Sequence, residues 1–261
     1  MLSSAQVASS AAAGHVLAAT RTAPSPLWYT ARATGVVALI LLTLTVALGV
    51  AGSTRLSPLG LPRLVRSGLH RNISLLSVAF VATHVLTTVL DPYAAISITS
   101  ALVPFSSHYR PFWLSLGTIA FDMVLALVLT SMVRTRLSYR TWRAVHWLAY
   151  ASWPIALWHG LGTGSDSRVS WLLILDGVCV LVVAAAALRH LQLLPAGRVR
   201  AIGRGATAAI MAATVVFVAV GPLQHGWARR AGTPSSMLGS PHAPSARQVS
   251  ANLTSTSGGA R

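Results

Sequence analysis

Four histidines lie at ordered positions within the most apolar part of this sequence. His70 and His84 are 14 residues apart, and His146 and His159 are 13 residues apart. Imidazole nitrogens ligate metal ions and occupy the axial positions of haem iron. Histidines on facing helices can ligate one iron from both sides, which favours electron transfer over oxygen binding. The pattern therefore predicts haem ligation by these four side chains.

Helix geometry places His70 and His84 on one face of a regular helix, but it places His146 and His159 on one face only if their helix is irregular. Fourteen residues at about 100° each return a side chain to within about 40° of its starting direction, so His70 and His84 share a face. Thirteen residues leave His159 about 140° away from His146. Pro154 lies between them and removes the helical hydrogen bond to the carbonyl of residue 150. We therefore predict a local irregularity between Tyr150 and Leu157.

Another class of function competes with haem binding. Intramembrane histidines also form hydrogen bonds between helices, so the chain could be a non-redox transporter or assembly subunit whose histidines only pack helices. A single four-histidine metal site does not fit, because the histidines of each pair are about 20 Å apart along a helix axis. Haem content of the purified protein distinguishes the two functions.

The elements that position these histidines are membrane-spanning segments. The chain is 54% hydrophobic and only 9% charged, against about 25% charged residues in soluble domains. Six apolar segments have the length that a helix needs to cross about 30 Å of hydrocarbon. They cover roughly residues 33–52, 70–90, 112–133, 142–162, 169–188 and 205–222. We expect an all-α, six-helix membrane domain over residues 33–222, between an N-terminal tail (1–32) and a disordered C-terminal tail (223–261).

The charge distribution predicts the topology. The 20 basic residues outnumber four acidic ones, but they punctuate apolar stretches rather than gather on a polar domain, which argues against nucleic-acid binding. Alternate loops are rich in arginine, and the positive-inside rule places them in the cytoplasm. These loops hold Arg55, Arg63, Arg66, Arg71, Arg134, Arg136, Arg140, Arg143, Arg189, Arg198, Arg200 and Arg204, whereas the other loops hold Arg110 and Arg168. Both termini are then outside, His70 lies at the depth of His146, and His84 at that of His159.

The paired histidines and their local sequences resemble the ferric reductase-like transmembrane domain. The strings LHRNISLLSVAFVATHV and TWRAVHWLAYASWPIALWHGLGTGSD look like the two histidine helices of that family, and the resemblance covers roughly residues 35–190. It implies two b-type haems held by His70 with His146 and by His84 with His159. The family includes ferric reductases, NADPH oxidases and the haem subunit of a periplasmic methionine sulfoxide reductase system. That last subunit suggests a flavin as a further cofactor.

The resemblance also defines the expected partners and location. Flavin- and nicotinamide-binding modules follow the haem domain in some relatives, but no GxGxxG fingerprint is present here, so we expect a separate donor, either a flavoprotein or quinol. The expected function is a relay of single electrons across the bilayer to an extracytoplasmic acceptor. Whether the chain is itself an enzyme, a haem-dependent oxidoreductase, stays open. We expect a multi-pass protein of the bacterial plasma membrane.

Four charged residues near these segments are further candidates. Arg71 and Arg143 lie beside the cytoplasmic-side histidines and are candidate partners of haem propionates, although topology alone also explains arginines there. Asp122 lies near the middle of the third segment and Asp176 lies in the fifth. A carboxyl group in lipid is costly, so each is either a functional group or a neutral hydrogen-bonded one.

Overall fold

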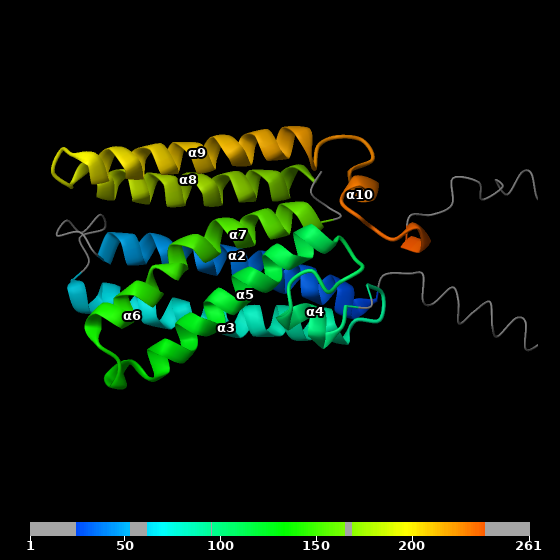
Figure 1. Ribbon diagram of the computed structural model, residues 1–261, viewed down its shortest axis with the longest axis horizontal. Coiled ribbons are helices and arrows are strands. Elements are labelled where there is room, and N and C mark those ends of the chain that lie inside the picture. The colour runs from blue at the N-terminus through cyan, green and yellow to red at the C-terminus, as the bar shows by residue number, and fades with distance from the viewer. Residues whose placement is uncertain (1–24, 53–61, 95, 165–168, 238–261) are drawn as a thin grey trace, which may run out of the picture.

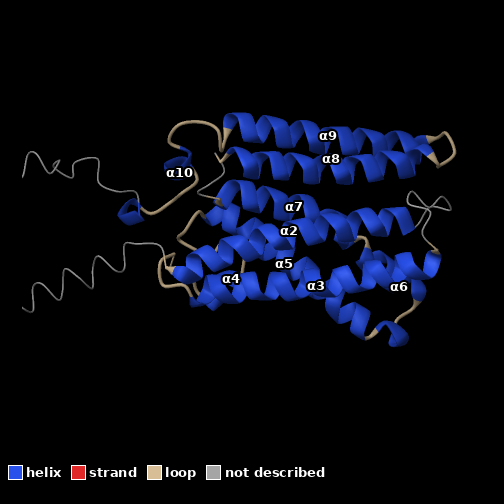
Figure 2. Cartoon of the chain, turned by 180° about the vertical axis from the view of Figure 1, so that it is seen from behind, coloured by secondary structure: helices blue, strands red, loops and turns tan. Residues whose placement is uncertain are grey.

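The structure is a bundle of long helices (Figure 1). The computed structural model describes residues 25–52, 62–94, 96–164 and 169–237, which contain helices and loops and no strand (Figure 2). The long helices are α2 (Pro26–Gly52), α3 (Arg63–Leu90), α5 (Pro111–Met132), α7 (Leu148–Thr163), α8 (Ser170–Gln192) and α9 (Arg198–Val220). Shorter helices are α4 (Ile98–Leu102), η1 (Arg134–Arg136), α6 (Tyr139–His146), α10 (Trp227–Arg230) and η2 (Ser235–Met237). The all-α prediction is confirmed.

Five of the described helices are long and apolar enough to cross a membrane, namely α2, α3, α5, α8 and α9. The remaining predicted segment is divided between α6 and α7, and the 16 residues of α7 would rise only about 24 Å. Large apolar side chains point outward along the bundle, including Leu75, Ile174 and Val215, which are 63%, 67% and 69% exposed. Such surfaces belong in lipid rather than in water.

The two ends of the bundle differ in composition. The start of α2 and the last described residues lie at one end (Figure 1), which we call the tail end. The opposite end, the arginine end, carries the start of α3 and the α5–α6 and α8–α9 connections. Most of the arginines that we assigned to cytoplasmic loops lie at the arginine end. Arg55 and Arg168 are outside the described residues. The up-and-down order of the helices agrees with the predicted topology, while their orientation in the membrane stays a prediction.

The boundaries of the expected tails need correction. Helix α2 begins at Pro26, inside the stretch 1–32 that we expected to be a tail. Expected disorder over 223–261 is wrong for residues 223–237, which contain α10 and η2 joined by turns and irregular segments. This segment is folded because the backbone N–H of Arg110 donates to the Gly232 carbonyl at 3.0 Å and the Trp227 ring packs on Trp113 and Phe217. Residues 238–261 lie outside the described part.

The irregularity expected around Pro154 is also misplaced. Helix α7 runs without interruption from Leu148 to Thr163 with Pro154 inside it. The break lies at Trp147, between α6 and α7, where the Tyr150 N–H donates to the Trp147 carbonyl three residues back at 3.1 Å. A proline removes one hydrogen bond, which a helix can tolerate, whereas this tightened turn ends one helix and starts the next.

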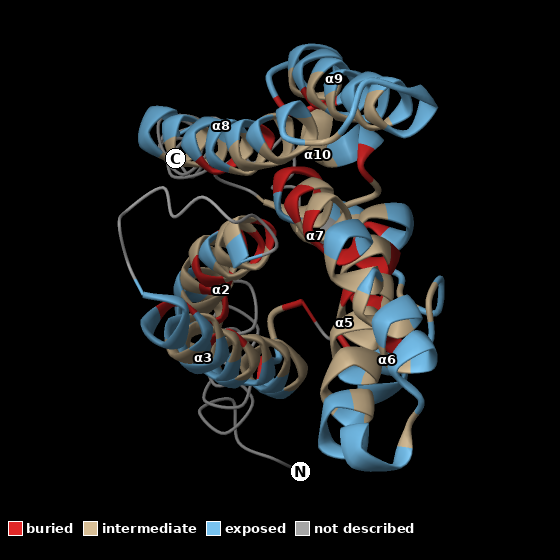
Figure 3. Cartoon of the chain, turned by 90° about the vertical axis from the view of Figure 1, so that its left-hand side faces the viewer, coloured by how far each residue is buried: buried red, intermediate tan, exposed pale blue. Residues whose placement is uncertain are grey.

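The interior is assembled from helix pairs. Helix α2 packs along α3, and α5 packs along α7, so that the two pairs face each other when viewed along the bundle (Figure 3). A buried apolar cluster joins α2, α7 and α8 through Val46, Trp153, Leu157 and Cys179. The indole Nε1 of Trp153 donates to the hydroxyl of Thr43 at 2.9 Å, which satisfies its polar group inside the core.

Candidate functional site

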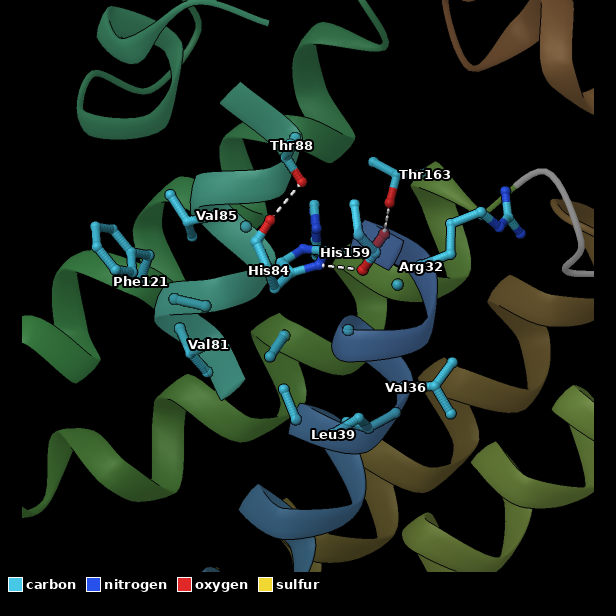
Figure 4. A pocket seen from close by; sticks show the side chains of 18 of the residues that line it. Arg32, Val36, Leu39, Val81, His84, Val85, Thr88, Phe121, His159 and Thr163 are labelled. Atoms are coloured by element: carbon cyan, nitrogen blue, oxygen red, sulfur yellow. Dashed lines mark hydrogen bonds between the residues drawn. The ribbon is translucent and has the colours of Figure 1, made fainter. Parts of the chain in front are cut away.

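Two of the predicted histidines lie side by side in a partly open cavity near the tail end. His84 projects from α3 and His159 from α7, and their ring centres are 6.3 Å apart with an interplanar angle of 77°. Both rings line a cavity of about 600 Å³, in which they lie toward one another (Figure 4). We call this pair the tail-end site. The structure thus brings together two residues that are 75 positions apart in the sequence.

The separation of the two rings suits a shared metal. A metal–imidazole bond is about 2 Å long, and a ring nitrogen lies about 1 Å from the ring centre, so two axial imidazoles on one metal have centres about 6 Å apart. The 6.3 Å between His84 and His159 meets this requirement. The cavity walls around them are mostly apolar, with Leu39, Val81 and Phe121 among the lining side chains. Such a pocket suits a large, flat, mostly apolar cofactor.

Hydrogen bonds define which nitrogen of each ring is available. The Nδ1 of His84 lies 2.6 Å from the carbonyl oxygen of Ala31, and that of His159 lies 2.9 Å from the carbonyl of Trp113. His70 makes the same contact with the Thr45 carbonyl at 3.1 Å. A carbonyl only accepts, so each Nδ1 carries the proton and donates. Each neutral ring then keeps its lone pair on Nε2, the arrangement of a metal-ligating histidine.

Glycines on the neighbouring helices make room for these rings. A Cβ atom at Gly35 would lie 3.0 Å from His84, one at Gly49 3.3 Å from His70, and one at Gly117 2.5 Å from His159. In each case the glycine follows the accepting carbonyl, at residues 31, 45 and 113, by four positions. We call each carbonyl–glycine pair a glycine seat. Gly35 and Gly49 are 14 residues apart on α2, as His84 and His70 are on α3.

A hydroxyl group four residues after each of these histidines donates to its carbonyl. Ser74 donates to His70 at 2.6 Å, Thr88 to His84 at 2.7 Å and Thr163 to His159 at 2.6 Å. Figure 4 shows the bonds of Thr88 and Thr163. Serine and threonine hydroxyls in helices commonly donate a hydrogen bond to the backbone carbonyl four residues earlier. Its recurrence means that three histidines share one local construction.

His146 is built differently. It ends α6, and its ring stacks on Trp142 with centres 4.9 Å apart and planes inclined by 18°. The guanidinium of Arg134 lies over the other ring of this stack, 4.5 Å from the centre of Trp142. His146 interacts electrostatically with His70, but the described residues contain no ring contact between the two. The two rings of the tail-end site are therefore in contact, whereas no ring contact joins the arginine-end pair, His70 and His146, in the described part of the chain.

The arginines chosen from the sequence lie at the surface. Arg71 and Arg143 are both exposed. Arg32, which the sequence pattern does not indicate as a candidate, is half-buried, lines the cavity of the tail-end site and lies over the ring of Trp28 at 5.7 Å. The glycine seats were also missed, although the 14-residue spacing shared by two glycines and two histidines was a signal that could have indicated them.

The two intramembrane aspartates occupy different surroundings. Asp176 of α8 lines the cavity and interacts electrostatically with Cys179. Asp122 is half-buried on α5 and is not among the cavity-lining residues. Asp176 is therefore the aspartate placed to influence a cofactor at the tail-end site. Among the described residues no group of three or more metal-binding side chains gathers, so ligation here rests on pairs.

A comparison with protein families gives one match. Residues 34–157 match the model of a family described as ferric reductase like transmembrane component. The matched range contains the glycines of the three seats and His70, His84 and His146, and it ends two residues before His159. No curated protein and no solved structure matched the chain.

Proposed function

Residues 34–157 are a ferric reductase-like transmembrane domain, and from that premise we propose that this chain is a transmembrane b-type cytochrome with two bis-histidine haems. It relays single electrons across the membrane to an extracytoplasmic acceptor. The domain itself implies redox electron transfer in an integral membrane protein. The number of haems, their ligands and the direction of transfer are our proposal.

The observation that supports the proposal best is the tail-end site. His84 and His159 come from different helices, yet their ring centres are 6.3 Å apart and both Nδ1–H groups are held by backbone carbonyls. Histidines that only pack helices need a hydrogen bond but have no reason to leave two Nε2 lone pairs beside a common cavity. We assign His84 and His159 to one haem and His70 and His146 to the other.

The protein residues hold, orient and insulate these cofactors. A haem bound at each pair would supply one-electron redox chemistry. The carbonyl partners fix the tautomer and the direction of three rings, and the glycines allow the rings to lie against neighbouring helices. Apolar side chains such as Val81, Val85 and Phe121 line the tail-end cavity and would keep water away from it. A haem held by two histidines would exchange electrons without binding oxygen.

The partners complete the proposed reaction. Electrons would enter at the arginine end, from a separate flavoprotein or from quinol, and leave at the tail end. In this orientation the arginine end faces the cytoplasm, as the positive-inside rule requires, and both termini are outside. Haem b is the cofactor we propose for both sites, and a flavin is a further candidate. We place the protein in a bacterial plasma membrane.

Haem stoichiometry tests the proposal. The full-length protein is purified from cells supplied with haem, and haem per chain is measured with reduced-minus-oxidised spectra. We expect two haems in the wild type and one in His84→Ala, His159→Ala and His70→Ala. His108→Ala, a loop histidine outside both pairs, is the matched control and should retain two. A colourless wild-type protein would exclude the proposed function.

A further inference from the structure

Arg66 is a buried cation inside an otherwise outward-facing helix turn. Its side chain is only 7% exposed, whereas the preceding Leu64 and Val65 are 85% and 51% exposed. Arg63, the other arginine of this first turn of α3, is also exposed, so Arg66 is the one residue of the turn that is buried. Its Nη1 atom is buried and has no hydrogen-bond partner among the described residues.

A buried guanidinium of this kind requires an anion. Removing a charge from water costs several kcal/mol unless a partner of opposite charge and further hydrogen bonds replace the solvent. Arginine stays protonated in proteins, so it cannot avoid this cost by becoming neutral. Because Nη1 is buried and has no acceptor, we expect an additional group that accepts its hydrogen bond to bind there.

The described part of the chain offers no carboxylate for this position. The whole sequence has only four acidic residues. Asp91 caps the far end of α3, about 37 Å away along the helix, and interacts with Ser25 there. Asp122 lies in the middle part of α5, and Asp176 lies in the first third of α8, toward the tail end. Asp166 is outside the described residues, between the end of α7 and the start of α8, which both lie at the tail end. The anion must therefore come from outside the described residues.

The position of Arg66 relates it to one histidine pair. Arg66 precedes His70 by four residues on α3, so both side chains lie on the same face of the helix. Helical side chains lean toward the N-terminus, which places the guanidinium between His70 and the arginine end of the bundle. A group ligated by His70 and carrying a carboxylate toward that end would come within reach of Nη1.

We propose that Arg66 binds a propionate carboxylate of the cofactor held at His70. This inference rests on the proposed function, because it assumes a haem at that position. It assigns propionate binding to Arg66, which the sequence analysis counts only among the arginines that determine membrane orientation. Arg71 and Arg143, the candidates nearest the histidines in sequence, are exposed, and exposed ion pairs are worth little.

A lipid phosphate is the other source of an anion at this end of the bundle. It shares the chemistry of the carboxylate, since both accept hydrogen bonds from a guanidinium. The two sources differ in what removes them. Esterification of the haem propionates removes the negative charge of the first source only, and replacement of anionic lipids by zwitterionic ones removes the net negative charge of the second only.

The test measures haem retention at one site. Full-length protein carrying His84→Ala, which leaves only the arginine-end site, is made by cell-free synthesis in nanodiscs with haem or haem dimethyl ester. Dissociation is followed by transfer of haem to apomyoglobin. Arg66→Gln should weaken retention of haem about 10- to 100-fold and leave retention of the ester unchanged. Arg66→Lys should be intermediate, and Arg71→Gln, the matched control, should lie within about twofold of its parent.

A redox titration gives a second readout that a merely structural role would not change. Loss of a positive charge beside the cofactor favours its oxidised form, so Arg66→Gln should make the midpoint potential more negative. An Arg66→Gln effect that persists with the dimethyl ester, or that vanishes when phosphatidylglycerol is replaced by phosphatidylcholine, would overturn the assignment. So would haem retention equal to that of Arg71→Gln. A wild-type chain that takes up no haem would instead refute the proposed function.

Discussion

The glycine seats lead to a graded prediction for three alanine substitutions. The added Cβ would lie 2.5 Å from the His159 ring in Gly117→Ala, 3.0 Å from His84 in Gly35→Ala and 3.3 Å from His70 in Gly49→Ala. Carbon atoms in favourable contact are about 3.5–4.0 Å apart. The His159 ring must therefore retreat by about 1 Å, the His84 ring by about half as much, and the His70 ring by a few tenths of an ångström.

The energetic consequence follows the same order. Forcing extra volume into a packed site costs about 1–3 kcal/mol, while alanine is favoured over glycine in a helix by about 1 kcal/mol. The two effects should nearly cancel at Gly49, whereas steric overlap should dominate at Gly117. Gly177→Ala on α8 is the matched control, because no side chain or backbone of another helix lies within 4 Å of its added Cβ, and it should be neutral or slightly stabilising.

Haem occupancy and redox titration of the purified variants provide the assay. Gly117→Ala should lose most of the haem at the tail-end site, Gly35→Ala should lose part of it, and Gly49→Ala should affect only the other site and only slightly. Equal effects of all three substitutions, or a larger effect at Gly49 than at Gly117, would refute the reasoning from these distances. Full occupancy in Gly117→Ala would refute the tail-end site itself.

Three further predictions concern other parts of the bundle. Pro154→Ala should leave haem content unchanged, because α7 is continuous through the proline and the break lies before it; loss of haem in the spectrum would contradict this. Arg110→Gln should lower the free energy of unfolding by about 1–3 kcal/mol, since Nη1 of Arg110 donates to the backbone carbonyl of Gly162 at 2.8 Å. Arg229→Gln, at an exposed arginine, should leave it unchanged, and equal melting temperatures of the two variants would exclude this hydrogen bond as a stabiliser. Asp176→Asn should raise the midpoint potential of the tail-end haem at alkaline pH, where a carboxyl is ionised, while Asp122→Asn should not; identical titration curves would remove Asp176 from the cofactor environment.

Much of the architecture could be predicted from hydrophobicity and histidine spacing. Long apolar segments predict helices because lipid offers no partner for backbone polar groups, and the resulting order correctly placed His84 and His159 at one depth. The family match over residues 34–157 agrees with the resemblance found in the local sequences. Ligand assignments and haem number remain predictions.

What the sequence did not reveal depends on contacts between distant segments. The burial of Arg66 could not be predicted from the sequence, because the positive-inside rule treats every arginine near a helix end in the same way. The break at Trp147 was missed because proline is the stronger local signal, yet it was the tightened turn seven residues earlier that separated the helices. Residues 223–237 have the composition of a loop, and they are ordered by their contacts with Arg110 and with the aromatic side chains of Trp113 and Phe217.

The contacts of Arg110 also have a consequence for biogenesis. Its guanidinium Nε donates to the hydroxyl of Thr233 at 2.8 Å, across 123 positions of sequence. During synthesis α5 emerges long before Thr233, so this contact can form only after α7, α8 and α9 have been made. A nascent chain with all its long helices inserted still lacks this contact. The segment 227–237 is therefore the last described part of the bundle that can pack against the start of α5, and its contacts join the end of the described chain to its middle.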